Sequence, residues 1–142
     1  MVASAPTDNS FLSWFVKLLI NNMRVTFLIT TSGILFYLFP LLVVFFNGIV
    51  LGFVIAYVGK PYGVPFVLLM LLPHGIFEIP AMVLAGETGV KMFWSVVTVV
   101  KSREWKRLPT TIILGYRTYV TRVAPLLLIA ALIEAVLIVW VP

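Results

Sequence analysis

Long apolar stretches separated by short polar ones make up most of the chain. The first of them, residues 25–59, contains no charged side chain. A single straight helix of this length would extend for about 52 Å, at about 1.5 Å per residue, whereas the hydrocarbon core of a bilayer is about 30 Å thick. The stretch is therefore predicted to form two short membrane segments that turn near Pro40.

A two-sided pattern precedes this stretch, between Ser10 and Arg24. Apolar and polar residues fall on opposite sides of a helix, the apolar ones being Phe11, Trp14, Phe15, Leu18 and Leu19 and the polar ones Ser13, Lys17, Asn21 and Arg24. The pattern favours an amphipathic helix in the membrane interface, with Ser10 as its N-cap, over a simple extension of the first spanning helix. Residues 1–10 are small and polar, lack the basic segment of a signal peptide, and are predicted to be a disordered tail.

Three further apolar stretches follow, at residues 64–85, 90–100 and 123–142. The Lys-Pro-Tyr-Gly run at residues 60–63 is predicted to be a loop, and the Gly-Glu-Thr-Gly run at residues 86–89 is predicted to break the apolar stretch around it. Together with the two segments before them, these stretches predict about five membrane segments. Some of the helices are short or broken, and all belong to a single helical domain over residues 11–142.

Composition agrees with this pattern and narrows the class of protein. Hydrophobic residues make up 62% of the 142 positions, and the mean hydropathy is +1.14. Soluble domains contain only about 45–50% apolar residues. The chain is therefore predicted to be an all-α, polytopic, multi-pass protein of the cell membrane that lies in the lipid bilayer. Because it has no cysteine, disulfides and thiolate metal sites are excluded.

The net charge is +5, and six of the ten basic residues lie between residues 101 and 122. By the positive-inside rule, this stretch is predicted to be a cytoplasmic loop that contacts anionic headgroups. A docking site for a specific partner is the alternative. Nucleic-acid binding is disfavoured because the basic residues do not lie on a folded soluble module. The six residues are Lys101, Arg103, Lys106, Arg107, Arg117 and Arg122.

Two ionisable residues, His74 and Glu78, lie four apart within an apolar segment, between Pro73 and Pro80. On a helix they share one face. An ionisable pair in hydrocarbon costs a few kcal/mol or more, so the pair is expected to face the protein interior or a water-filled cavity. It is predicted to act as a polar staple between helices, with binding of a cation or a proton as the alternative.

A third ionisable residue, Glu134, lies in the middle of the last apolar stretch and needs a donor, for which His74, Asn47 or an arginine are candidates. A metal site built from His74, Glu78 and Glu134 is a further alternative, with water or carbonyl groups in its open positions. An intramembrane hydrolase with Glu78 as general base would need that same metal and is the least favoured hypothesis.

No enzymatic arrangement is found, and neither a catalytic residue nor a cofactor is expected. The single histidine has no candidate serine in its segment, and neither an HExxH zinc motif nor a glycine-rich phosphate loop after a strand occurs. Glycines instead indicate where helices approach one another, as in the GxxxG spacing beside Asn47. The predicted packing positions are Gly48, Gly52, Gly75, Gly86 and Gly89.

Four short motifs occur in a definite order along the chain. They are Asn21-Asn22-x-Arg24, Asn47-Gly48 with Gly52, Pro73-His-Gly-x-x-Glu78-x-Pro-Ala81, and Ala85-Gly86-x-x-Gly89. Between about residues 21 and 94 the chain thereby resembles the stage II sporulation protein M family of bacterial and archaeal membrane proteins. The resemblance implies a polar core, and assigns no catalysis to it, that consists of Asn21, Asn22, Asn47, His74, Gly75 and Glu78.

What the resemblance implies about function is limited. The sporulation member of that family is a multi-spanning protein that localises peptidoglycan hydrolases at the engulfing septum, whereas many relatives occur in organisms that do not sporulate. We expect a non-enzymatic membrane protein that organises or recruits partners, and that forms a homo-oligomer or associates with other membrane proteins. A channel or transporter for ions or small solutes that uses His74 and Glu78 is the alternative.

Overall fold

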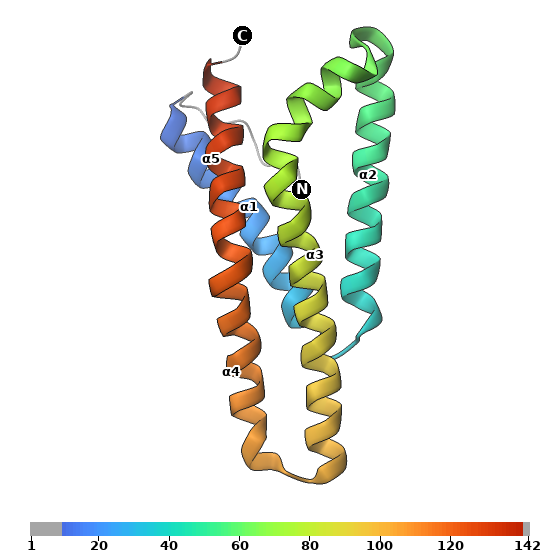
Figure 1. Cartoon of the computed structure of the whole chain (residues 1–142), viewed down its shortest axis with the longest axis vertical. Helices are drawn as coiled ribbons and strands as arrows, with labels where there is room; N and C mark the ends of the chain where they lie inside the picture. The colour runs from blue at the N-terminus through green and yellow to red at the C-terminus, as the bar shows by residue number, and fades with distance from the viewer. Residues whose placement is uncertain (1–9, 141–142) are drawn as a thin grey trace.

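The computed structural model describes residues 10–140, which form helices joined by short turns and contain no strand. The order of the main helices is α1 (Phe11–Ser32), α2 (Leu38–Tyr62), α3 (Val64–Ser102), α4 (Leu108–Thr118) and α5 (Ala124–Trp140). α4 and α5 return alongside α3, and α1 crosses this pair (Figure 1). Apart from Ser10, the disordered tail predicted for residues 1–10 lies outside the described residues.

Four helical segments of the described chain are long and apolar enough to cross a membrane, namely α1, α2, α3 and the segment Trp105–Trp140. The last segment is continuous because a 3₁₀ turn, Trp105–Arg107, leads into α4 and a π-helical turn, Tyr119–Val123, joins α4 to α5. The all-helical membrane architecture predicted from the sequence is confirmed, with four such segments in place of about five.

The N-terminal amphipathic stretch is not a separate helix. It is the first part of α1, which continues to Ser32 because no glycine or proline interrupts it. α1 therefore joins this stretch to the first apolar segment. Ser10 is the N-cap, as predicted, and its hydroxyl accepts a hydrogen bond of 3.3 Å from the N–H of Ser13.

The two turns around α2 differ slightly from their predicted positions. The chain turns between Ser32 and Leu38, and Pro40 lies in the first turn of α2. Proline is tolerated there because the first N–H groups of a helix have no helical partner. The predicted loop at residues 60–63 is reduced to Gly63, whose φ of 84° is one that residues with a side chain rarely adopt.

The sequence predicts a break at residues 86–89, but α3 continues through them as a helix. α1 crosses α3 so closely here that a Cβ on Gly33 would overlap the backbone of Gly89. A Cβ on Gly89 would lie 2.9 Å from the carbonyl oxygen of Ile29 and 3.1 Å from Cγ of Pro40. The glycines therefore allow two helix backbones to approach, and this packing outweighs their cost of about 1 kcal/mol each in a helix.

Pro73 and Pro80 also lie inside α3. Each removes one backbone N–H, so a carbonyl one turn earlier loses its helical donor. Figure 1 shows the first turns of α3, in green, running obliquely away from α2 before the helix descends beside α5. A bend of this kind is expected in a helix with interior prolines.

The buried core lies where α1 meets α3 and α5. Ile29 of α1 and Leu127 of α5 are fully buried, and Tyr119 donates a hydrogen bond of 3.0 Å to the carbonyl of Met23. Small residues of α3 and α5 are fully buried in this region, and small side chains let helices approach closely; they are Ala81, Ala85, Ala130, Ala131 and Ala135. α2 packs mainly on α3 and leaves most of its apolar side chains exposed, as a lipid-facing helix does.

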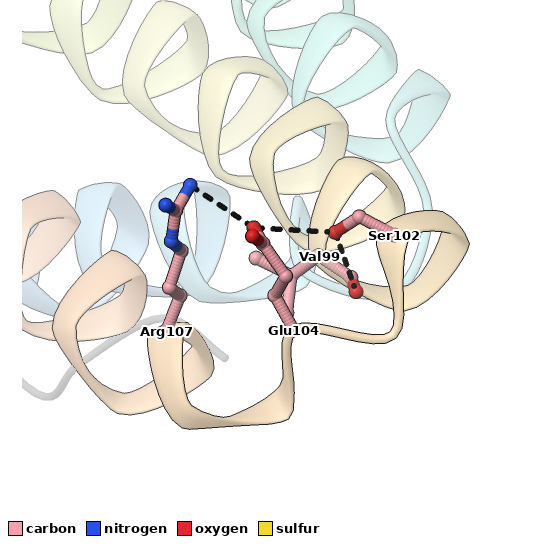
Figure 2. Close-up of polar contacts among 4 residues, drawn as sticks. All are labelled: Val99, Ser102, Glu104 and Arg107. Atoms are coloured by element: carbon pink, nitrogen blue, oxygen red, sulfur yellow. Dashed lines mark hydrogen bonds and ion pairs between the residues drawn. The ribbon is translucent and has the colours of Figure 1, made fainter.

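Residues 101–122 are mostly helical, whereas the sequence predicts a loop. α3 ends at Ser102, and the following residue, Arg103, has a φ of 57° that turns the chain toward α4. Figure 2 shows how the turn is held: the Glu104 carboxylate pairs with the Arg107 guanidinium at 3.0 Å and lies 3.4 Å from the Ser102 hydroxyl. The basic stretch therefore forms the tip and the second arm of a helical hairpin, with α3 as its first arm.

Candidate intramembrane polar site

His74, Glu78 and Glu134 form one cluster between α3 and α5. His74 and Glu78 lie one turn apart on α3, and Glu134 comes from α5. One ligand atom of each side chain, an imidazole nitrogen or a carboxylate oxygen, lies within 4.8 Å of the other two. Ala130 and Ala131 are fully buried one turn before Glu134, so small residues allow α5 to bring this carboxylate close to α3.

No lysine or arginine of the described residues forms an ion pair with the cluster, whose one basic member is His74. The ion pairs in that part of the chain join Glu87 to Lys91 and Glu104 to Arg107, and both pairs are exposed. Of the donors expected for Glu134, His74 lies within 4.8 Å of it, whereas Asn47 donates to the carbonyl of Val43 and no arginine of the described residues forms an ion pair with it. His74 Nδ1 is buried without a hydrogen-bond partner in the described residues.

A small cavity of about 60 Å³ adjoins the cluster and shares Glu78 with it. Four helices contribute to its wall, which consists of Asn21, Asn22, Val25, Thr26, Asn47, Glu78, Met82 and Leu127. A water molecule needs about 10–15 Å³ of such space, so the cavity has room for a few. The three asparagines that the sequence places in the polar core thus lie around one space with Glu78.

The asparagines differ in how their amides are satisfied. Nδ2 of Asn47 donates a hydrogen bond of 2.8 Å to the carbonyl of Val43, and Nδ2 of Asn21 lies 3.4 Å from Oδ1 of Asn22. Asn22 is only 8% exposed, and its own Nδ2 has no partner in the described residues. An unpaired buried amide costs roughly 1–3 kcal/mol, so this group favours a further acceptor in the cavity.

The arrangement provides one imidazole and two carboxylates in a partly buried, low-polarity setting. Two like charges about 4.8 Å apart repel by roughly 3–4 kcal/mol at an effective dielectric constant near 20. A cation or a proton between them removes this repulsion. The chemistry open to the cluster is therefore the binding of a positive charge or a neutral hydrogen-bonded staple.

The predicted packing glycines fall into two groups. Gly86 and Gly89 lie at the crossing of α3 with α1 and α2, where Gly86 faces Ile29 and Val44. By contrast, a Cβ on either glycine of the GxxxG pair would meet nothing within 4 Å, and one on Gly75 would meet only the end of Ile79. The structure therefore places no helix contact within the described chain at Gly48, Gly52 or Gly75.

The contact that the sequence did not predict is the one made by Gly33. Its partner is Gly89, which follows Ala81 and Ala85 at intervals of four residues. Small residues at that spacing form a flat strip along a helix, and this strip is the signal that could have located the crossing. The six basic residues of the stretch lie elsewhere: four are at the tip of the hairpin, Arg117 is on α4 and Arg122 is in the π-helical turn that follows it, and all six are exposed.

These features define the class: an all-helical membrane protein with a polar cluster between its packed helices. The chain belongs to the stage II sporulation protein M family, whose profile matches residues 1–137. It is also 31% identical over 123 residues to an uncharacterized protein of Methanocaldococcus jannaschii, covering 84% of this chain and 68% of that protein. No solved structure matches the chain. The resemblance inferred from the motifs is confirmed.

Proposed function

We propose that this protein is a multi-pass component of the cell membrane that recruits and organises partner proteins and catalyses no reaction itself. The observation that carries the proposal is the hairpin of α3 and α4, which extends well beyond the turn between α1 and α2 (Figure 1). Exposed basic residues surround its tip, namely Lys101, Arg103, Lys106 and Arg107. A charged extension of this kind is suited to docking a partner protein at the membrane surface.

The length of α3 supports this placement of the tip. Its 39 residues extend for about 58 Å, nearly twice the thickness of about 30 Å of a hydrocarbon core. The last turns of α3 therefore reach past the lipid when its apolar first part lies within it. Trp105 is exposed at the tip, and Trp94 is exposed about two turns before the end of α3, beside Tyr37 of the turn between α1 and α2. Headgroups suit such rings, and the positive-inside rule puts the tip in the cytoplasm.

The hairpin is held in shape by its own contacts. Gly115 of α4 lies directly against the Met92 side chain of α3, and Glu104 pairs with Arg107 at the turn. Single exposed ion pairs contribute only about 0.2–1 kcal/mol, so docking requires several at once. The hairpin tip presents several basic side chains together, so it can form several ion pairs at once with an acidic surface of a partner protein. Anionic lipid headgroups compete with such a partner for the same basic side chains.

Site-specific photo-crosslinking in the full-length protein tests the proposal. A benzophenone side chain in place of Trp105 is expected to give a discrete protein adduct in native membranes. The same group in place of Phe53, an exposed residue of α2, is expected to give lipid adducts only. Lys101→Glu with Lys106→Glu should lower the Trp105 adduct about tenfold, because two of the docking charges are reversed.

Two controls make this result decisive. Lys101→Arg with Lys106→Arg keeps the charges and should keep the adduct. Arg107 is left unchanged, since it holds the turn through Glu104. If position 105 yields lipid adducts alone, or if charge reversal leaves the protein adduct unchanged, recruitment by this hairpin is wrong.

A channel or transporter for ions or small solutes is the second candidate function, and the cavity beside Glu78 is the observation that favours it. Purified protein in proteoliposomes is then expected to pass a cation, with flux reduced at least tenfold in Glu78→Gln. Glu87→Gln, which changes an exposed carboxylate of the same helix, is the matched control. Flux no greater than in protein-free vesicles would exclude this function.

A further inference from the structure

We infer that His74, Glu78 and Glu134 form a binding site for one divalent first-row transition-metal ion, such as Mn²⁺ or Zn²⁺. The inference goes beyond recruitment of partners and requires no flux across the membrane. It starts from the cluster itself: three side chains from two helices present their ligand atoms within 4.8 Å of one another.

The spacing suits a single ion. Metal bonds to histidine nitrogen and carboxylate oxygen are about 2.0–2.2 Å long, so two ligands of one tetrahedral ion lie about 3.3–3.6 Å apart. The three ligand atoms, which lie within 4.8 Å of one another, therefore need to close by up to about 1.5 Å. Side-chain torsions absorb a movement of this size without displacing α3 or α5.

The donor set selects the class of metal. Mg²⁺ and Ca²⁺ favour sites made of oxygen atoms alone, and Cu(I) favours sulfur ligands. One imidazole nitrogen with two carboxylate oxygens is instead typical of Mn²⁺, Fe²⁺, Co²⁺ or Zn²⁺. With three protein ligands, positions remain for water, which the adjoining cavity of about 60 Å³ can hold.

Charge balance supports a dication. Two carboxylates and a neutral imidazole carry two negative charges, which one divalent ion neutralises. Neither Glu78 nor Glu134 takes part in an ion pair with a basic residue of the described chain. In a packed membrane domain a neutral assembly is far less costly than a pair of unpaired carboxylates.

Two unpaired polar atoms provide independent support. Asn22 is more than nine-tenths buried, lines the cavity beside Glu78, and has an Nδ2 without a partner in the described residues. This N–H can donate to a water molecule held in the cavity. His74 Nδ1 is also buried and unpaired among the described residues. Hydrogen-bonding capacity thus remains available next to the carboxylates.

A proton shared by the two carboxylates is the rival state, and a metal titration separates the two. Full-length protein purified in detergent with chelator and then dialysed is titrated with Mn²⁺ followed by electron paramagnetic resonance, and with Zn²⁺ followed by elemental analysis. We expect one ion per chain and, in pulsed spectra of bound Mn²⁺, a ¹⁴N coupling from the histidine. Mg²⁺ and Ca²⁺ should compete weakly.

Matched variants locate the site. Glu134→Gln and Glu78→Gln are expected to weaken metal binding at least tenfold, and His74→Gln to remove the ¹⁴N coupling. Glu87→Gln, on the exposed side of α3, should change neither. The hairpin variant with Lys101→Glu and Lys106→Glu should bind metal normally, so failure of recruitment and failure of this inference are distinguishable.

Three results would overturn the inference: no saturable binding at millimolar Mn²⁺ or Zn²⁺, binding that Glu134→Gln and Glu78→Gln leave unchanged, or bound Mn²⁺ without nitrogen coupling. Helix content and elution volume show whether a variant folds. If a carboxylate variant does not fold, the ¹⁴N coupling of the wild-type protein still decides whether His74 is a ligand, because it is the only histidine in the chain.

Discussion

Gly89→Leu is expected to lower the free energy of unfolding by more than about 3 kcal/mol. Even the first atom of the new side chain would lie 2.9 Å from the carbonyl oxygen of Ile29 and 3.2 Å from that of Thr30. These are backbone atoms of α1, so α1 must move away from α3 as a whole. Fully buried Ile29 would then lose its packing. Unfolding of purified protein in mixed micelles, followed by circular dichroism, measures the change.

Gly48→Leu is the matched control on α2. A Cβ at this position meets nothing within 4 Å, so the larger side chain enters open space that lipid or detergent fills. Replacing a helical glycine by leucine should raise stability by up to about 1 kcal/mol. A loss of stability equal to that of Gly89→Leu would show that Gly48 packs against a neighbour, as a second copy of the chain would provide.

Leu127→Ala is the second substitution with a large expected effect. Leu127 is fully buried in the core formed by α1, α3 and α5, and it also lines the cavity beside Glu78. Removing three carbon atoms from such a site costs about 2–5 kcal/mol, through lost contacts and the space left behind. The same unfolding measurement should show this decrease.

Leu128→Ala provides the comparison at the next position of the same helix. Leu128 is 46% exposed and faces away from the core. Its truncation should change the free energy of unfolding by no more than about 0.5 kcal/mol, as for other surface positions. Equal losses at positions 127 and 128 would contradict the packing of α5 described above.

The helix boundaries show which local signals were strong. Ser10 caps α1 because a serine hydroxyl can accept a hydrogen bond from a backbone N–H of the first turn, a property of the residue itself. Gly63 ends α2 for a similarly local reason, its positive φ. The helix break predicted at residues 86–89 was wrong because glycine can have two opposite effects on a helix. It weakens an isolated helix, but it also permits close contact with another helix, and sequence pattern alone does not distinguish these cases.

The basic stretch illustrates the same limit. Its charges suggested a loop, yet residues 108–118 are helical and pack on α3 through Gly115 and Met92. Charged side chains on one arm of a hairpin remain exposed whether or not the backbone is helical. Packing against α3, the other arm of the hairpin, therefore decided that residues 108–118 are helical.

For the candidate site, the sequence alone determined which residues are chemically unusual. His74, Glu78 and Glu134 stand out because ionisable groups are costly within apolar stretches, whatever the fold. The spacing of four residues also placed His74 and Glu78 on one face of a helix.

Only the tertiary structure decided that Glu134 joins them and that the asparagines gather around a cavity with Glu78. Residues 78 and 134 are far apart along the chain, and their meeting depends on how closely α3 and α5 pack. Buried alanines make that approach possible, but many helix pairings satisfy the same pattern of apolar residues. Composition and periodicity determine that helices form and enter a membrane; the fit of their surfaces determines which side chains meet.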